Sequence, residues 1–192
     1  MRIETFPEAS VPNAMRVRVV ALQDRAWPSD RASDAAPWHD PALSPVSMVL
    51  LDDDDDAVVA ALDILSKDVL VAGARLAASG LSAVVTDPDH RGEGHGTTLC
   101  TAAREHIEAS GADLGIFTCD RELLGFYLGA GWEHLEGTVL IGGTPEDPLP
   151  SDGDGFDKVT LGAFFTGKAR AARADVVGAR VELYPGLIDR LW

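Results

Sequence analysis

The sequence predicts a single domain of the α/β (α+β) class. Three apolar runs between residues 46 and 86 are separated by turn residues, which indicates antiparallel strands in sequence. From residue 75 onward the apolar spacing alternates between strand and helix periods and gives the order β-α-β-α-β. A chain of 192 residues is of ordinary size for one domain with a full core. We expect one domain over residues 1–192, with its core at 46–141 and a C-terminal strand and tail at 156–192.

The first expected element is a helix that begins at Ser10-Val-Pro-Asn. Serine can cap the free amides and proline suits the first turn of a helix. An apolar stripe recurs at helical spacing and ends at Pro28; its members are Met15, Val19, Leu22 and Ala26. Residues 28–45 are rich in proline and aspartate, which indicates an irregular segment or a short helix.

A three-stranded antiparallel section is expected next. Residues 46–51 and 57–71 form a hairpin, with the acidic run 52–56 at its tip, and Gly73 turns the chain into a third strand at 75–86. The acidic run has calcium-like chemistry but lacks the glycine and the distant glutamate of a calcium loop. We interpret it as a solvated turn.

The second half of the core alternates helices and strands. A helix over about 96–110 carries Leu99, Ala103 and Ile107 on one face, and Gly111 ends it as a left-handed cap. A strand at 113–119, a short helix at 121–128 ended by Gly131 and a strand at 132–141 follow.

The remaining chain is expected to hold a long loop, one more strand and a mixed tail. Residues 142–155 are dense in Gly, Pro, Asp and Ser and predict a surface loop. Residues 156–165 predict a strand, and the tail from 167 to 192 is helical at first and strand-like around 181–183.

Composition excludes several functions. The chain has 16 Lys and Arg against 31 Asp and Glu, a formal charge of −15, whereas a phosphate-tracking nucleic-acid binder is basic. We expect no nucleic acid as partner; this charge favours a small cationic ligand. The sequence has no apolar run of membrane-span or signal-peptide length, so we expect no membrane span and a cytoplasmic location.

Cysteines and histidines give no metal pattern. Cys100 and Cys119 are expected to be free thiols that act as small core residues, because neither has a histidine partner at motif spacing. The five histidines form no H-x-x-x-H pattern, so we expect no metal.

A glycine-rich turn carries the clearest chemistry. An apolar strand leads into Arg91-Gly-Glu-Gly-His-Gly96 and then directly into an amphipathic helix. Glycines let successive N–H groups turn toward an anion, and the start of the helix adds its free amides. The segment is not a Walker loop or a dinucleotide fingerprint. It indicates either a phosphate-binding nest or an ordinary strand-to-helix turn.

Two motifs resemble the GNAT acyltransferase superfamily. Arg91-x-x-Gly94-x-Gly96 matches its R/Q-x-x-G-x-G/A diphosphate loop, and Phe126-Tyr127-x-x-x-Gly131-Trp132 is similar to its F-Y-x-x-x-G-F/W segment. The resemblance implies the GNAT fold, a central mixed and mostly antiparallel sheet splayed between strands 4 and 5 and flanked by helices. It also implies acetyl-CoA as co-substrate in that cleft, and it covers residues 46–141 best.

The resemblance implies a role for each matched residue. The backbone of Val84, Val85 and Thr86 would pair with the pantetheine arm as an added strand. Tyr127 would be the general acid that protonates the CoA thiolate; the alternative is a core aromatic on the face with Leu124 and Leu128. The turn that would hold the diphosphate consists of Arg91, Gly92, Glu93, Gly94, His95, Gly96 and Thr97.

Within the superfamily the chain is most similar to aminoglycoside 2'-N-acetyltransferases. Residues 48–92 align without a gap, DLGIFTCDRELLGFYLGAGW matches in spacing, and both chains end in tryptophan, here Trp192. Ser82 departs from the pattern: those enzymes carry a glutamate there, just before the fourth-strand bulge, suited to accept a proton from the substrate ammonium. A serine is no base at neutral pH without help.

Several side chains are candidates for the acceptor site. Asp120 is either a substrate-facing carboxylate or the N-cap of the next helix. Asp30, Asp34 and Asp40 border the acceptor pocket by resemblance, or are solvated loop acids. Trp38 stacks on a sugar or anchors its loop. The other acceptor candidates are Ser82, His134, Asp152, Asp154, Asp189 and Trp192.

The expected function is acetyl transfer from acetyl-CoA to a primary amine of a cationic small molecule, an aminoglycoside or aminosugar, by direct attack. The alternatives are another amine, such as a polyamine, an amino acid or a biosynthetic aminosugar, and a non-catalytic acyl-CoA-binding domain. A homodimer is common in the superfamily.

Overall fold

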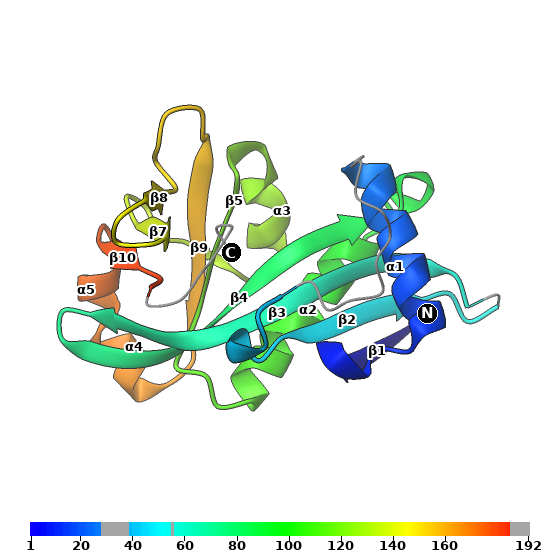
Figure 1. Ribbon diagram of the computed structural model, residues 1–192, viewed down its shortest axis with the longest axis horizontal. Coiled ribbons are helices and arrows are strands. Elements are labelled where there is room, and N and C mark those ends of the chain that lie inside the picture. The colour runs from blue at the N-terminus through cyan, green and yellow to red at the C-terminus, as the bar shows by residue number, and fades with distance from the viewer. Residues whose placement is uncertain (28–38, 55, 185–192) are drawn as a thin grey trace. The chain divides into compact units, whose positions relative to one another are not determined.

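The computed structural model describes residues 1–27, 39–54 and 56–184 (Figure 1). Over these residues, hydrogen bonds link strands into one sheet of order β1-β2-β3-β4-β5-β9-β6 and a second of order β10-β7-β8. Helices flank the sheets, so the predicted mixed α/β class is confirmed. The candidates Asp30, Asp34, Trp38, Asp189 and Trp192 lie outside the described residues.

The chain packs as two compact units. The described residues of Met1–Leu65 and Leu81–Ala103 form unit 1, and those of Ser66–Gly80 and Arg104–Trp192 form unit 2. Three elements run through both units: β3 (Val58–Val71), β4 (Ala74–Thr86) and α2 (His95–Ala109). The expectation of a single domain stays a prediction.

Unit 1 is built on antiparallel strands. Besides its parts of β3, β4 and α2, it contains β1 (Arg2–Pro7), η1 (Glu8–Ser10), α1 (Asn13–Ala26), η2 (Pro41–Leu43), β2 (Val46–Leu51) and η3 (Pro88–His90). β2 pairs with β1 on one side and with β3 on the other. The predicted hairpin with the acidic run at its tip is therefore confirmed.

Helix α1 covers one face of the unit 1 sheet, and the first part of α2 lies on the other (Figure 1). Val19 and Leu22 of α1 are buried against a strand cluster, and Met15 and Ala26 pack at its edge, as the apolar stripe predicted. The strand members of that cluster are Val49, Leu51, Val58, Ala61 and Val85.

The start of the chain differs from expectation. Helix α1 begins at Asn13, and its N-cap is Pro12, which makes no side-chain cap bond. Ser10 lies in η1 instead of capping α1, so the predicted serine cap is wrong. Strand β1 was not predicted, because this edge strand is only partly buried and carries charged side chains that obscure the strand pattern.

Unit 2 is centred on β5 (Leu114–Asp120) and β9 (Lys158–Phe164), which pair antiparallel along the full length of both strands. β5 also pairs in parallel with β4, at Ala78 and Ser79. The other elements are η4 (Arg121–Leu123), α3 (Leu124–Gly129), β6 (Glu133–His134), β7 (Val139–Gly143), β8 (Pro148–Pro150), α4 (Gly167–Ala171), α5 (Arg173–Val176) and β10 (Arg180–Glu182).

The predicted strand at 132–141 is two strands in different sheets. β6 pairs with β9, whereas β7 pairs with β8 and β10. Gly137 separates them at φ +74°, a backbone angle that few side chains tolerate. The Thr138 hydroxyl donates to the Val176 carbonyl at 3.0 Å and fixes the turn against α5. The predicted loop at 142–155 contains β8.

Among the helices in the described part of the chain, none combines the length and the apolar content that crossing a membrane would require.

Candidate active site

The glycine-rich turn joins η3 to α2 in unit 1. The Asp87 carboxylate accepts a hydrogen bond of 2.9 Å from the Asp89 amide and starts the turn. Gly92 and Gly94 have φ of +84° and +85°, a conformation that glycine adopts without strain. Thr98 donates its amide to the Gly94 carbonyl at 2.9 Å, as the helical ladder of α2 begins. The amides at the start of a helix are left free for a ligand.

The exposure of the turn suits an anion. Gly92 and Gly94 are exposed, and a Cβ placed on either would meet nothing within 4 Å. Solvent therefore reaches Gly92 and Gly94, and their positive φ angles are of the kind found in backbone anion nests, whereas Gly96 in the first turn of α2 is buried. The backbone nest stays a prediction, with which the positive φ angles of Gly92 and Gly94 are compatible.

Three side chains of the turn form a cluster that sequence spacing did not predict. Glu93 Oε2 lies 3.3 Å from Nδ1 of His90 and 2.9 Å from Nε2 of His95. These hydrogen bonds hold the pKa of Glu93 below its usual value. The ligand atoms of the three residues lie within 4.8 Å of one another, a geometry that could hold a metal ion. The corresponding signal in the sequence is the spacing H-x-x-E-x-H, which an H-x-x-x-H pattern does not include.

Strand β4 reaches the turn through a local irregularity. Ala83 has φ +50°, which interrupts the regular strand, as in a bulge. Val85 is buried in the unit 1 core, whereas Ser82, Val84 and Thr86 are only partly buried. Beyond the strand, the Asp87 amide donates to the Val59 carbonyl at 2.8 Å, so β4 stays attached to β3.

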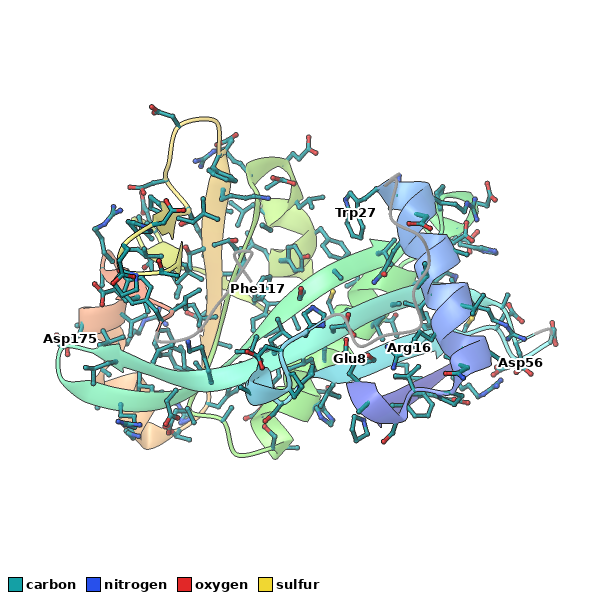
Figure 2. The ribbon with its side chains drawn as sticks, viewed as in Figure 1. Glu8, Arg16, Trp27, Asp56, Phe117 and Asp175 are labelled. Atoms are coloured by element: carbon teal, nitrogen blue, oxygen red, sulfur yellow. The ribbon has the colours of Figure 1, made fainter. Side chains whose placement is uncertain are left out.

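Ser82 lies at one end of a row of three polar side chains in unit 1. Its Oγ lies 3.5 Å from Nε2 of His39, and Nδ1 of His39 lies 3.0 Å from Oε1 of Glu8. The Glu8 side chain is 1% exposed and that of His39 is 15% exposed. Arg16 on α1 donates to the backbone carbonyl of Glu8 at 2.6 Å (Figure 2). The row therefore runs from a buried carboxyl to a partly exposed hydroxyl.

A second buried carboxyl belongs to the same neighbourhood. Asp63 on β3 accepts a hydrogen bond of 2.6 Å from the Ser47 hydroxyl. Burial raises the pKa of Asp63 to about 6; the negative charge of Glu8 adds to the rise, while the Ser47 bond and the charges of His39 and Arg16 oppose it. Its Oδ2 has no hydrogen-bond partner among the described residues.

Tyr127 lies in unit 2, on α3. Its ring makes edge-to-face contacts with Phe117 and Phe126, at centroid distances of 5.0 and 4.8 Å. The residue is 5% exposed. This burial is what the alternative interpretation, a structural aromatic residue in the core, predicts. The role of Tyr127 as a general acid stays a proposal.

Asp120 ends β5, and its carboxylate lies 2.8 Å from Nζ of Lys158. Asp120 occupies the N-cap position of η4, as predicted, but its side chain makes no cap hydrogen bond to the helical turn that follows. The ion pair with the neighbouring strand takes its place, since Lys158 is the β9 partner of Asp120.

The described acceptor candidates lie apart in the chain. Asp40 accepts from the Ala42 amide at 2.9 Å and caps η2 in unit 1. Asp152 lies in unit 2 with Arg180 at 2.8 Å, and that guanidinium lowers the pKa of its carboxyl. Ser82, also in unit 1, differs from these two in that its hydroxyl lies near a histidine, His39.

Both cysteines are buried, as predicted. Burial raises the pKa of Cys100 to about 12 and, with the Asp120 charge, that of Cys119 to about 11. Both remain thiols at neutral pH, and the thiol is a poor nucleophile. This agrees with their prediction as small core residues.

The chain matches one family model, described as an acetyltransferase (GNAT) domain, over residues 11–135. A search of curated proteins finds no match.

Several solved structures share the fold. A GNAT family N-acetyltransferase (YhbS) from Escherichia coli in complex with CoA has a TM-score of 0.64 and 20% identity, covering 98% of this chain and 95% of that chain. An aminoglycoside 6'-N-acetyltransferase complexed with coenzyme A has a TM-score of 0.59 and 12% identity, covering 86% and 98%. A glucosamine-6-phosphate N-acetyltransferase from Arabidopsis thaliana has a TM-score of 0.54 and 14% identity, covering 68% and 91%.

Proposed function

Since this chain belongs to the GNAT acetyltransferase domain family and is an acyl-CoA-dependent N-acetyltransferase, we propose that it acetylates a primary amine of a small cationic molecule. The donor is acetyl-CoA and the acceptor is an aminoglycoside or a related aminosugar. The observation that carries the proposal is the exposed turn with Gly92 and Gly94 at positive φ ahead of α2.

The turn fits the diphosphate of the donor. Its backbone amides are oriented by the glycine angles, and the start of α2 adds a positive partial charge. Arg91 is exposed beside the turn and supplies a cation in a strongly acidic protein. Within the turn, the carboxylate of Glu93 is held by hydrogen bonds to His90 and His95.

Strand β4 supplies the binding edge for the pantetheine arm. The strand beyond Ala83 offers the backbone groups of Val84, Val85 and Thr86 to an extended chain, which would add to the sheet as a strand does. In this arrangement the N–H near Val85 meets the negative charge that develops on the thioester oxygen.

The reaction is a direct transfer. The neutral amine attacks the thioester carbonyl, a C–N bond forms, and the C–S bond breaks as the thiolate leaves. Tyr127 gives a proton to the sulfur, because a phenol with a pKa near 10 can donate as charge develops on a thiolate. No cysteine takes part, in agreement with the raised thiol pKa values.

The net charge of the protein and the activities of two fold neighbours favour a cationic acceptor. The formal charge of −15 attracts ammonium groups, and unit 1 adds the buried acids Glu8, in the row with His39 and Ser82, and Asp63. Two of the fold neighbours are an aminoglycoside 6'-N-acetyltransferase and a glucosamine-6-phosphate N-acetyltransferase.

The test measures thiol release from acetyl-CoA with a panel of amines. Kanamycin B has an amine at position 2' and kanamycin A has a hydroxyl there, so acetylation of B alone supports 2' transfer. Acetylation of both indicates another position, such as 6'. Activity only with spermidine, an amino acid or glucosamine would mean that the acceptor belongs to another class of amine.

Tyr127→Phe tests the acid. We expect a loss of kcat of about 10²-fold or more, with unchanged acetyl-CoA binding. Tyr184→Phe, at the other tyrosine of the chain, is the matched control. Acetyl-CoA binding without thiol release from any amine would instead identify the non-catalytic acyl-CoA-binding alternative, to which Ser82 gives weight.

A further inference from the structure

A primary amine is protonated near neutral pH and cannot attack a thioester until it loses a proton. Ser82 stands where the similar enzymes carry a glutamate suited to this step, and a hydroxyl alone is far too weak a base. The reaction therefore needs another proton acceptor close to β4, and a group in contact with Ser82 is the nearest candidate.

The group in contact with Ser82 is an imidazole. Nε2 of His39 lies 3.5 Å from the Ser82 hydroxyl, a long hydrogen bond of the kind that can shorten when substrate binds. His39 lies just ahead of η2, 43 residues before Ser82, and its side chain is 15% exposed. An imidazole titrates near neutral pH, which a hydroxyl does not.

Glu8 fixes the orientation of that imidazole. An ionised carboxylate can only accept hydrogen bonds, so the 3.0 Å contact with Nδ1 of His39 requires the proton to be on Nδ1. The lone pair of the neutral ring is then on Nε2, which faces Ser82. The same carboxylate stabilises the imidazolium that forms when Nε2 takes a proton.

We propose that Ser82, His39 and Glu8 form a proton relay that deprotonates the ammonium group of the acceptor. The proposal rests on the proposed acetyl transfer and assigns its base. The ammonium N–H bond breaks and its proton goes to Ser82 Oγ, while the Ser82 proton goes to Nε2 of His39. The products are a neutral amine and an imidazolium, and the proton later leaves to solvent. Glu8 is a positioning residue.

The position along β4 suits the proposed donor site. Ser82 precedes Val84 by two residues, about 7 Å along a strand. The relay and the β4 edge both belong to unit 1. Ala83, at φ +50°, lies between them and interrupts the regular alternation of side chains.

The surroundings of His39 favour a cation. The charged and polar groups around it come from several elements of unit 1: Glu8 of η1, Arg16 of α1, Ser47 of β2, Asp63 of β3 and Ser82 of β4. Two are acids and one is a permanent cation. Above a pH of about 6, where Asp63 is ionised, the two acids outweigh Arg16 and an ammonium beside Ser82 would meet a net attractive field.

The first experiment measures kcat/KM for the amine against pH, using whichever of kanamycin B, spermidine and glucosamine the wild type acetylates fastest. We expect His39→Gln to lower this value by about 10² to 10⁴-fold at pH 7. The loss shrinks toward pH 10, where the free amine forms without help. His106→Gln, a partly buried histidine on α2, is the matched control and keeps wild-type kinetics.

The second experiment uses rescue, which a purely structural role of His39 would not show. Ser82→Glu in the His39→Gln background places a carboxylate where the similar enzymes have one, and we expect it to restore activity at pH 7 at least tenfold.

Glu8→Gln removes the charge that favours the imidazolium, so the acidic limb of the profile moves to lower pH. Dissociation constants for acetyl-CoA should change less than twofold in all these variants.

A third measurement does not depend on activity. Nitrogen-resolved histidine NMR of the free protein should show His39 protonated at Nδ1, and Glu8→Gln should weaken this preference. A His39 tautomer protonated at Nε2, or a His39→Gln enzyme with a wild-type pH profile, overturns the relay and leaves acetyl transfer intact. Absence of thiol release with every amine up to pH 10, while acetyl-CoA binds, overturns the proposed function itself.

Discussion

The Asp63 carboxylate on β3 accepts a 2.6 Å hydrogen bond from the Ser47 hydroxyl on β2, and both side chains are buried. The two residues are direct partners in the antiparallel register of these strands. They continue the sheet face of Val49 and Ala61, because every second residue of a strand points to the same side. An ionisable group thus extends the apolar face that α1 covers.

Asp63 should make stability depend on pH. Burial raises its folded pKa from 3.8 to about 6, so between these values the folded protein holds a proton that the unfolded chain has lost. The contribution of Asp63 to the free energy of unfolding is largest below pH 4, falls as pH rises to about 6, and is flat above. The total fall is on the order of 2–3 kcal/mol.

Asp63→Asn isolates this effect, because an amide does not titrate and can still accept from Ser47. The stability of the variant relative to wild type should rise between pH 4 and pH 6.5 and then level off, measured by urea unfolding at each pH. Asp147→Asn, at an exposed loop acid, is the control and should give a flat difference. A flat difference for Asp63→Asn as well would mean that the folded carboxyl titrates normally.

Gly94→Ala should weaken acetyl-CoA binding. The φ of +85° costs an alanine about 1–2 kcal/mol, and the turn can relieve the strain by rotating its amides out of the nest conformation. The added methyl meets no atom within 4 Å, so crowding plays no part. We expect the dissociation constant measured by calorimetry to rise about tenfold.

Gly155→Ala is a close control, because Gly155 has φ +86° and equally open surroundings in another loop. It should lose similar stability and bind acetyl-CoA as wild type does. Equal acetyl-CoA affinity of the two variants would mean that the glycine-rich turn does not bind the donor.

Asp120 and Lys158 form an ion pair whose energetic weight is small, since their side chains are 55% and 27% exposed. Asp120→Asn and Lys158→Met should each change the free energy of unfolding by less than about 1 kcal/mol. If Asp120 has the proposed acceptor role, Asp120→Asn should raise KM for the cationic amine several-fold, because an amide no longer attracts an ammonium group. Lys158→Met leaves the carboxylate in place and should not raise it; an equal rise would mean that the pair acts only through structure.

Local patterns predicted the fold and the turn, whereas contacts between distant residues had to come from the structure. The stripe of α1 and the left-handed glycine ends of helices are properties of a few neighbouring residues. Glu8, His39 and Ser82 are separated by 31 and 43 positions, and no spacing rule connects them. Residues 132–141 were predicted as one strand because their β-formers are continuous, and the turn at Gly137 depends on packing against α5.

Gly115→Ala should destabilise unit 2. A Cβ at Gly115 of β5 would lie 2.6 Å from the Trp132 ring and 3.2 Å from that of Phe165, closer than van der Waals contact allows. Trp132 is 2% exposed and makes an edge-to-face contact with Phe117, so it cannot move away freely. Overpacking of this kind costs about 1–3 kcal/mol, measured as a lower urea midpoint at constant m-value.

Gly125→Ala is the matched control, because its Cβ enters open space on α3 and alanine favours a helix by up to about 1 kcal/mol. The two Gly-to-Ala changes should therefore move stability in opposite directions, and equal effects would mean that the ring of Trp132 yields to the methyl group.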